Sequence, residues 1–104
     1  LMSDLNLDKY LKDKKARDKQ KKKVYKETYT YIKSIIQDAI NRGESSTHYG
    51  VPIFNHQSPD YEALECICYI VEKIKESLLL VKIVTNIKVV EPNTLYIEWD
   101  MSKL

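Results

Sequence analysis

The last third of the chain, residues 58–99, most constrains the fold, because a helical pattern there runs directly into two alternating strands. Ser58, Pro59 and Asp60 are typical of a helix start: a capping serine, a proline at the first helical position and an acid in the first turn. Five apolar residues then recur at spacings of three and four, which predicts one buried stripe: Leu64, Ile67, Val71, Ile74 and Leu78. We therefore expect a helix over residues 58–77 that packs on a sheet.

The segment after this helix has the composition and the period of β-strands. Val and Ile dominate residues 79–90, which predicts the first strand. The residue types at 91–94 are those of a turn. Leu95, Ile97 and Trp99 then alternate with polar neighbours, the pattern of a half-buried strand. A C-terminal β-hairpin is expected, with these three side chains facing the helix.

A second helical pattern lies upstream, in residues 24–42. Its apolar residues also recur at spacings of three and four: Tyr25, Tyr29, Ile32, Ile36, Ala39 and Ile40. Gly43 follows directly and suits the position just after a helix. Residues 44–50 are polar and are expected to form a loop. The apolar segment 51–54 (VPIF) is expected to be an edge strand or an extended segment, because Pro52 has no amide hydrogen.

Together these elements predict an α+β fold of order α-β-α-β-β, in which two helices pack on a small antiparallel sheet. A length of 104 residues suits one domain. We expect a compact α+β domain over residues 24–104 and a basic N-terminal arm, a solvated helix or a frayed extension of the next one, over residues 1–23.

Charge is distributed unevenly along the chain. Residues 1–27 hold 10 of the 17 basic and 5 of the 15 acidic residues, so their net charge is +5 and that of the remainder is −3. Nine cations fall within fifteen residues: Lys9, Lys12, Lys14, Lys15, Arg17, Lys19, Lys21, Lys22 and Lys23. Such a run can bind a polyanion by counterion release, although it has no aromatic residue to stack on bases. Three interpretations remain open: a solvated helix without a ligand, docking on an acidic protein surface, and nucleic-acid binding.

Few residues invite a catalytic or metal-binding interpretation. His48 and His56 lie in polar segments with no Cys or carboxylate at a ligand spacing, and we expect both at the surface. Cys66 and Cys68 lie two apart on the predicted helix, so their side chains diverge by about 200° and cannot bridge each other. Free and mostly buried thiols fit a reducing compartment.

The carboxylates and glycines do not suggest an active site either. Asp60, Glu62 and Glu65 fit helix capping and solubility better than paired acid–base work, which needs a cleft that shifts their pKa values apart. Two isolated glycines cannot form the usual phosphate-binding loops. No segment has the roughly 20 apolar residues that span a bilayer. We therefore expect a non-enzymatic protein with no cofactor, no metal and no membrane span.

Five segments follow one another in a particular order: LNLDKYLKDKK, YTYIKSIIQDAI, VPIF, PDYEALECICYIVEKI and PNTLYIEW. In their order and spacing they resemble a family of small uncharacterised proteins of nucleocytoplasmic large DNA viruses, the giant viruses and their relatives. The chain departs from that pattern at LLLVKIV, where a glycine commonly ends the helix, and at HQS, where a glycine-containing turn is usual. The resemblance implies a viral origin and a location in the virion or the cytoplasm of the infected cell. It supplies no catalytic residue.

We therefore expect a viral interaction protein, a small subunit or accessory component of a virion, capsid or viral enzyme complex. It would dock through its α+β module and its basic arm. The alternative is a nucleic-acid-binding protein that acts through the Lys-rich arm without reading sequence. The exposed edge of the hairpin is a further candidate for docking, because an unpaired strand can pair with another chain.

Overall fold

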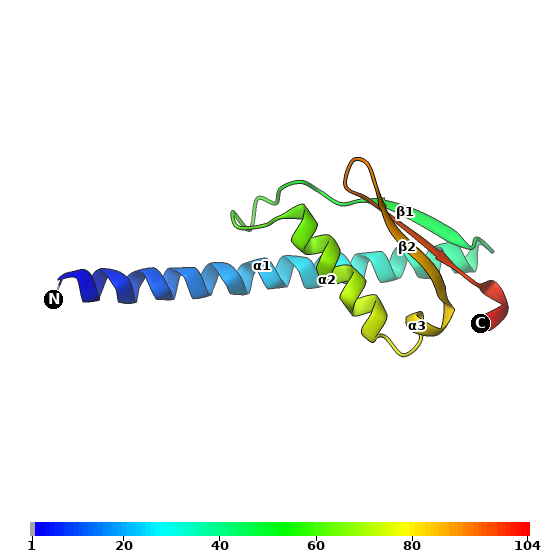
Figure 1. The fold of residues 1–104 in the computed structure, drawn as a ribbon, viewed down its shortest axis with the longest axis horizontal. Coiled ribbons are helices and arrows are strands. Elements are labelled where there is room, and N and C mark those ends of the chain that lie inside the picture. The colour runs from blue at the N-terminus through cyan, green and yellow to red at the C-terminus, as the bar shows by residue number, and fades with distance from the viewer. Residues whose placement is uncertain (1) are drawn as a thin grey trace.

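A computed structural model describes the backbone of residues 2–104 and the side chains of residues 7–104. In chain order it contains α1 (Met2–Asn41), β1 (Ser46–Gly50), α2 (Ala63–Glu76), α3 (Leu80–Ile83), β2 (Val84–Val90), β3 (Thr94–Trp99) and a 3-10 turn at Met101–Lys103 (Figure 1). The strands form one antiparallel sheet in the order β1-β3-β2. The expected α+β class and element order are confirmed, with α3 as an additional helical turn.

Helix α1 is the longest element and passes through residues 23 and 24 without a break. Its 40 residues account for most of the longest dimension of the molecule, which measures 65 × 28 × 19 Å. Its C-terminal half lies beside the other elements and its N-terminal half projects beyond them (Figure 1). The helix ends at Asn41, and Gly43 lies just beyond it with a φ of 79°, the left-handed conformation that glycine favours. The amides of Gly43 and Glu44 donate to the carbonyls of Ile40 and Ala39, which confirms the expected helix end.

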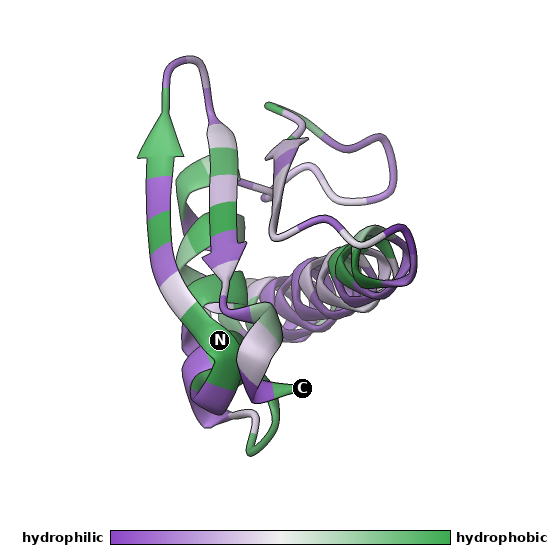
Figure 2. Ribbon diagram, turned by 90° about the vertical axis from the view of Figure 1, so that its right-hand side faces the viewer, coloured by the Kyte–Doolittle hydropathy of each residue, from purple (hydrophilic) through white to green (hydrophobic). Residues whose placement is uncertain are grey.

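Strand β3 lies at the centre of the sheet and carries the innermost side chains. Leu95, Ile97 and Trp99 are 0%, 0% and 2% exposed, as the alternation predicted. Ile97 has Thr47 of β1 on one side and Ile87 of β2 on the other. Figure 2 shows the alternation of hydrophilic and hydrophobic residues along the hairpin strands. The sheet therefore presents one apolar face to the helices.

Both long helices contribute to a single core with this face. Their most deeply buried residues are Ile32, Ile36 and Ala39 of α1 and Cys66, Ile70 and Ile74 of α2. Burial of each isoleucine among them stabilises the fold by about 1.5–3 kcal/mol. The buried side of α2 is centred on Cys66, Ile70 and Ile74, which lie four residues apart. Leu64 and Leu78, which the spacing placed in the buried stripe, are 65% and 83% exposed.

The first strand lies one segment earlier than the sequence suggested. β1 occupies residues 46–50, which were expected to form a loop, and residues 51–54 lie outside the sheet. β1 pairs with β3 along its whole length, and Thr47 and Tyr49 are half-buried opposite Ile97 and Leu95. Pairing with a buried neighbour decides this strand, because its own composition is mainly polar.

Helix α2 begins at Ala63, so the expected start at Ser58 was wrong. Residues 58–61 form a turn in which the Tyr61 amide donates to the Ser58 carbonyl at 3.2 Å. The Tyr61 ring packs edge-on against Tyr25, with 5.6 Å between centroids, and its hydroxyl donates to the Pro52 carbonyl. These contacts hold the chain in a turn, and the helix can begin only after it.

The strand predicted from residue 79 begins at Val84 instead. Leu80 and Ile83, 7% and 1% exposed, lie three residues apart on one side of the helical turn α3. The Ser77 hydroxyl accepts from the Leu80 amide at 3.2 Å at the start of this turn. An apolar run of this kind suits a buried helical turn as well as a strand, and the contacts of these two side chains decide between them.

Candidate functional site

The basic half of α1 is helical and exposed along residues 9–23. Of its nine cations only Lys21 is half-buried. Lys, Arg, Gln and Ala favour helix, and this half continues a helix that is already packed over residues 24–41, so it needs no separate nucleation. The domain therefore holds the basic half in a defined direction.

The nine cations fall on two sides of α1. With about 100° per residue, six of them and Lys26 lie within an arc of about 140°, and all are exposed: Lys9, Lys12, Lys15, Lys19, Lys22, Lys23 and Lys26. This set, the lysine stripe, is centred about 150° from the side of α1 that faces the core. Among the described side chains, Asp8 and Glu27 are the acidic ones at its ends. Lys26 was absent from the predicted set. It could have been identified by a helical projection continued past residue 23, which places it among the other stripe lysines.

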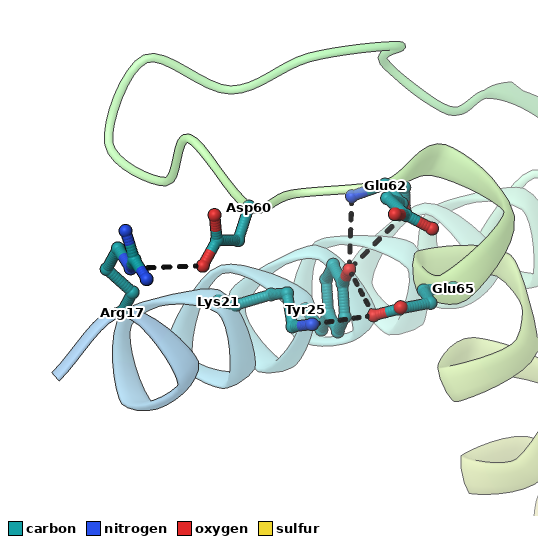
Figure 3. A network of polar contacts seen from close by, with 6 residues as sticks. All are labelled: Arg17, Lys21, Tyr25, Asp60, Glu62 and Glu65. Atoms are coloured by element: carbon teal, nitrogen blue, oxygen red, sulfur yellow. Dashed lines mark hydrogen bonds and ion pairs between the residues drawn. The ribbon is translucent and has the colours of Figure 1, made fainter. Parts of the chain in front are cut away.

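The other three cations, Lys14, Arg17 and Lys21, lie on the core-facing side. Arg17 Nε is 3.4 Å from Asp60 Oδ2, and Lys21 Nζ is 3.0 Å from Glu65 Oε1 (Figure 3). The hydrogen bond between Lys21 and Glu65 raises the pKa of the lysine and lowers the pKa of the carboxyl group. Among residues 7–104, Lys14 has no ion-pair partner. Intramolecular pairing thus occupies two of the nine predicted residues.

Tyr25 completes this polar network at the start of α2. Its hydroxyl accepts from the Glu62 amide at 3.1 Å and donates to Glu65 Oε1 at 3.0 Å (Figure 3). Burial raises the pKa of Tyr25 to about 12, so the phenol stays a neutral donor near pH 7. Glu62, the residue before α2, makes no capping bond with its own side chain. Tyr25 therefore satisfies a backbone amide that α2 itself leaves open.

An open groove of about 1240 Å³ separates the middle of α1 from the N-terminal half of α2. Its α1 wall is mostly basic, with Asp18 as its one acidic residue: Lys19, Lys21, Lys22, Lys23 and Lys26. Its α2 wall is acidic and partly apolar: Glu62, Leu64, Glu65, Cys68, Tyr69 and Glu72. A polyanion in this groove would meet carboxylates as well as cations. Of the lysine stripe, Lys9, Lys12 and Lys15 lie outside this groove and away from its carboxylates, so this part of the stripe is the better polyanion surface.

The two histidines lie on the surface in separate aromatic contacts. His48 of β1 is 4.7 Å from the Tyr96 ring, and His56 is 5.1 Å from the Phe54 ring, between centroids. Within the described residues, no group of three His, Cys, Asp or Glu side chains could hold a metal ion.

The two cysteines differ in their surroundings. Cys66 is fully buried, and burial raises the pKa of its thiol. Cys68 is exposed and lines the groove, so the expectation that both thiols are mostly buried holds for one of them only. They lie on different sides of α2, as the spacing predicted.

The hairpin leaves β2 at the edge of the sheet. Val89 and Val90 on this strand are 50% and 40% exposed. A shallow hollow of about 290 Å³ lies between β2 and the helices, lined in part by Val71, Val81 and Ile87. Among the residues described, no helix has the length and apolarity needed to cross a membrane.

A family model described as a family of unknown function (DUF5759) matches residues 5–75, and the chain therefore belongs to this family. The matched region contains the lysine stripe, β1, both walls of the groove and most of α2, and it ends before the β2–β3 hairpin. No curated protein and no solved structure matches the chain.

Proposed function

We propose that this member of the DUF5759 family is a non-enzymatic viral interaction protein, a small accessory component of a larger viral assembly in the virion or the infected cytoplasm. The α+β domain docks on that assembly, and the basic half of α1 provides a second contact. The viral setting is supported by the five sequence segments that resemble small proteins of giant viruses.

The lysine stripe is the observation that carries this proposal. Every lysine in it has another lysine three or four positions away on the same side of the helix. Each such like-charge pair destabilises an isolated helix by about 0.2–0.5 kcal/mol. All seven stripe lysines are exposed and none contributes to the core, so the interactions of these lysines with one another are repulsive. Carboxylates on a partner surface would attract these lysines and offset the repulsion between them.

The chemistry of the stripe favours a partner recognised by charge rather than by shape. Lysine is a point charge without the planar fork of arginine, and the one arginine of the basic half pairs with Asp60 on the other side of the helix. The stripe spans about 26 Å at 1.5 Å per residue. This length suits an extended row of carboxylates on a protein surface.

Affinity purification of the tagged full chain from infected cells, with and without nuclease, tests the proposal. Virion or core proteins should be retained in both preparations. The variant Lys12→Gln/Lys15→Gln/Lys19→Gln should retain less of them. The matched control, Lys75→Gln/Lys82→Gln/Lys103→Gln, removes the same charge from exposed lysines of the domain and should retain them fully. Failure to retain any virion or core protein, or equal losses in both variants, would refute the proposal.

Nucleic-acid binding is the second candidate, and the density of the stripe favours it. Seven cations within about 26 Å face a duplex that carries one charge per about 1.7 Å of its axis. If all seven contacted phosphates, the logarithm of the binding constant would fall with the logarithm of salt concentration with a slope of about −6. The absence of aromatic residues in the stripe means that single-stranded bases would gain no stacking.

Titration of duplex DNA with the full chain at several salt concentrations tests this candidate. The triple variant of the stripe should lower the slope by about 2.7, since each phosphate contact contributes about 0.9. The domain variant should leave it unchanged. Lack of binding at low salt, or the same slope for both variants, would exclude nucleic acid as the ligand of the stripe.

A further inference from the structure

We infer that the N-terminal end of α1 carries a second contact, on the side opposite the lysine stripe, for an acidic amphipathic helix of a partner protein. This inference rests on the proposed function and specifies the class of partner. The contact consists of Leu7, Tyr10 and Leu11 together with Lys14.

Three apolar side chains are exposed together at this end of the helix. Leu7, Tyr10 and Leu11 are 54%, 54% and 52% exposed. They lie at positions i, i+3 and i+4, with Lys14 at i+7, so all four share one side of α1. Apolar residues at this spacing are the anchors with which one helix packs against another.

This exposed side continues an interface that the chain already makes. With about 100° per residue, the four residues lie within an arc of about 100° around the core-facing direction of α1. Further along the same side, Lys21 pairs with Glu65, and Arg17 pairs with Asp60 just before α2 (Figure 3). Between Arg17 and the N-terminus, no element of the described part of the chain covers this side of α1 (Figure 1).

The part of this side that α2 and the preceding turn cover indicates what the exposed part, at residues 7–14, would bind. There, each cation on this side of α1 meets a carboxylate from the covering element. Lys14 is the next cation of the series and has no acidic partner among the described side chains. A helix that covers the site therefore needs apolar residues against the two leucines and Tyr10, and a Glu or Asp against Lys14.

Other occupants fit this site less well. A second copy related by a two-fold axis would bring two basic halves together, each within a segment of net charge +5, and like charges across an interface are unfavourable. A nucleic-acid backbone offers nothing to the three apolar side chains.

Fluorescence anisotropy with two synthetic peptides and the full chain tests the inference. Both are 21-residue amphipathic helices with leucine at heptad positions a and d; one has glutamate at the flanking positions and the other lysine. The glutamate peptide should bind at least about tenfold more tightly than the lysine peptide. The variant Leu7→Ser/Leu11→Ser should weaken it by at least about tenfold, because truncated central anchors commonly cost that much. Both leucines lie outside the core, and circular dichroism checks that the domain is intact.

Two charge-reversal variants distinguish binding at this site from non-specific attraction between the acidic peptide and the basic half of α1. Lys14→Glu should reverse the preference between the peptides, and Lys12→Glu, with the same charge change on the stripe, should leave it in place. Absence of binding by the glutamate peptide, equal effects of the two reversals, or unchanged binding by the leucine variant would overturn the inference. If viral proteins co-purify but the peptide does not bind, this contact fails and the proposed function stands. If the peptide binds but no viral protein co-purifies, the viral assembly is refuted and the helix contact stands.

Discussion

The two halves of α1 belong to one helix and have one periodicity, but their side chains meet different surroundings. On the core-facing side, Ile32 and Ile36 of the C-terminal half are 1% and 2% exposed. On the same side of the N-terminal half, Leu7 and Leu11 are more than half exposed. Helical period sets the side on which a residue lies, and the presence of a covering element decides whether that side is buried.

The two halves should therefore differ in stability as well as in exposure. Residues 24–41 share the free energy of unfolding of the core. Residues 7–23 form a helix end in water, where a segment of this length is marginal by itself. A mutation should cost much in one half and little in the other, and four sets of variants measure how far this holds.

The largest difference should come from truncating one apolar residue in each half. Ile32→Ala removes a buried side chain and should lower the free energy of unfolding by about 2–5 kcal/mol. Leu11→Ala, on the same side of the same helix, should change it by no more than about 0.5 kcal/mol. Urea denaturation followed by circular dichroism measures both. Similar costs for the two would mean that the N-terminal half is covered in solution.

A smaller effect should come from Tyr25, where the packed half meets α2. Tyr25→Phe leaves the Glu62 amide without the hydroxyl that accepts its hydrogen bond, which should cost about 1–2 kcal/mol. Tyr31→Phe, at a tyrosine that is 57% exposed, should cost almost nothing. Thermal unfolding compares the two. Equal stability of both variants would show that the Tyr25 hydroxyl does not support the start of α2.

The ion pair between Lys21 and Glu65 should make a pH-dependent contribution of no more than about 1 kcal/mol, because both groups are partly exposed. The pKa of Glu65 is lowered in the fold, so its share is present above the ordinary glutamate pKa and is lost as pH falls through the folded value. The pKa of Lys21 is raised, so its share is lost at strongly alkaline pH.

Lys21→Met should therefore be less stable than the parent chain at pH 7, and the difference should shrink as the pH is lowered to about 3, below the ordinary glutamate pKa. Lys22→Met, at the neighbouring exposed position, serves as the control and should match the parent at both values. A difference for Lys21→Met that persists unchanged in acid would assign the effect to packing of the lysine side chain instead.

The smallest effect on stability should come from the lysine stripe itself. Lys12→Gln/Lys15→Gln/Lys19→Gln removes repulsion between neighbours and should leave the free energy of unfolding unchanged or raise it by less than about 0.5 kcal/mol. Urea denaturation at low salt provides the measurement. A clear loss of stability would show that the stripe has a structural partner within the chain.

The sequence predicted those parts of the fold whose pattern is strong by itself. Leu95, Ile97 and Trp99 alternate cleanly, and Gly43 follows a long apolar period, so the central strand and the end of α1 were correct. β1 was missed because its residues are mostly polar and become a strand only by pairing with β3. The start of α2 was misplaced because contacts of Tyr61 with distant residues outweigh the local capping signal at Ser58.

The basic residues of the candidate site and their two sides of the helix could be predicted from the sequence, but their ion pairs could not. The nine cations stand out in the sequence, and a helical projection of residues 9–26 would have separated the stripe from Lys14, Arg17 and Lys21. Their ion pairs could not be anticipated, because Asp60 and Glu65 reach α1 only through the path of the loop and the position of α2. Neither is visible in a local pattern.

Hydrogen exchange of individual amides in the isolated full chain tests the contrast between the two halves most directly. We expect amides of residues 28–39 to be protected close to the level of global unfolding, and those of residues 9–20 to exchange at least about 100-fold faster, because helix ends in water open locally. Addition of the glutamate peptide should then slow exchange in residues 9–20. Equal protection of both halves in the free chain would contradict the account, since the basic half would then already be covered.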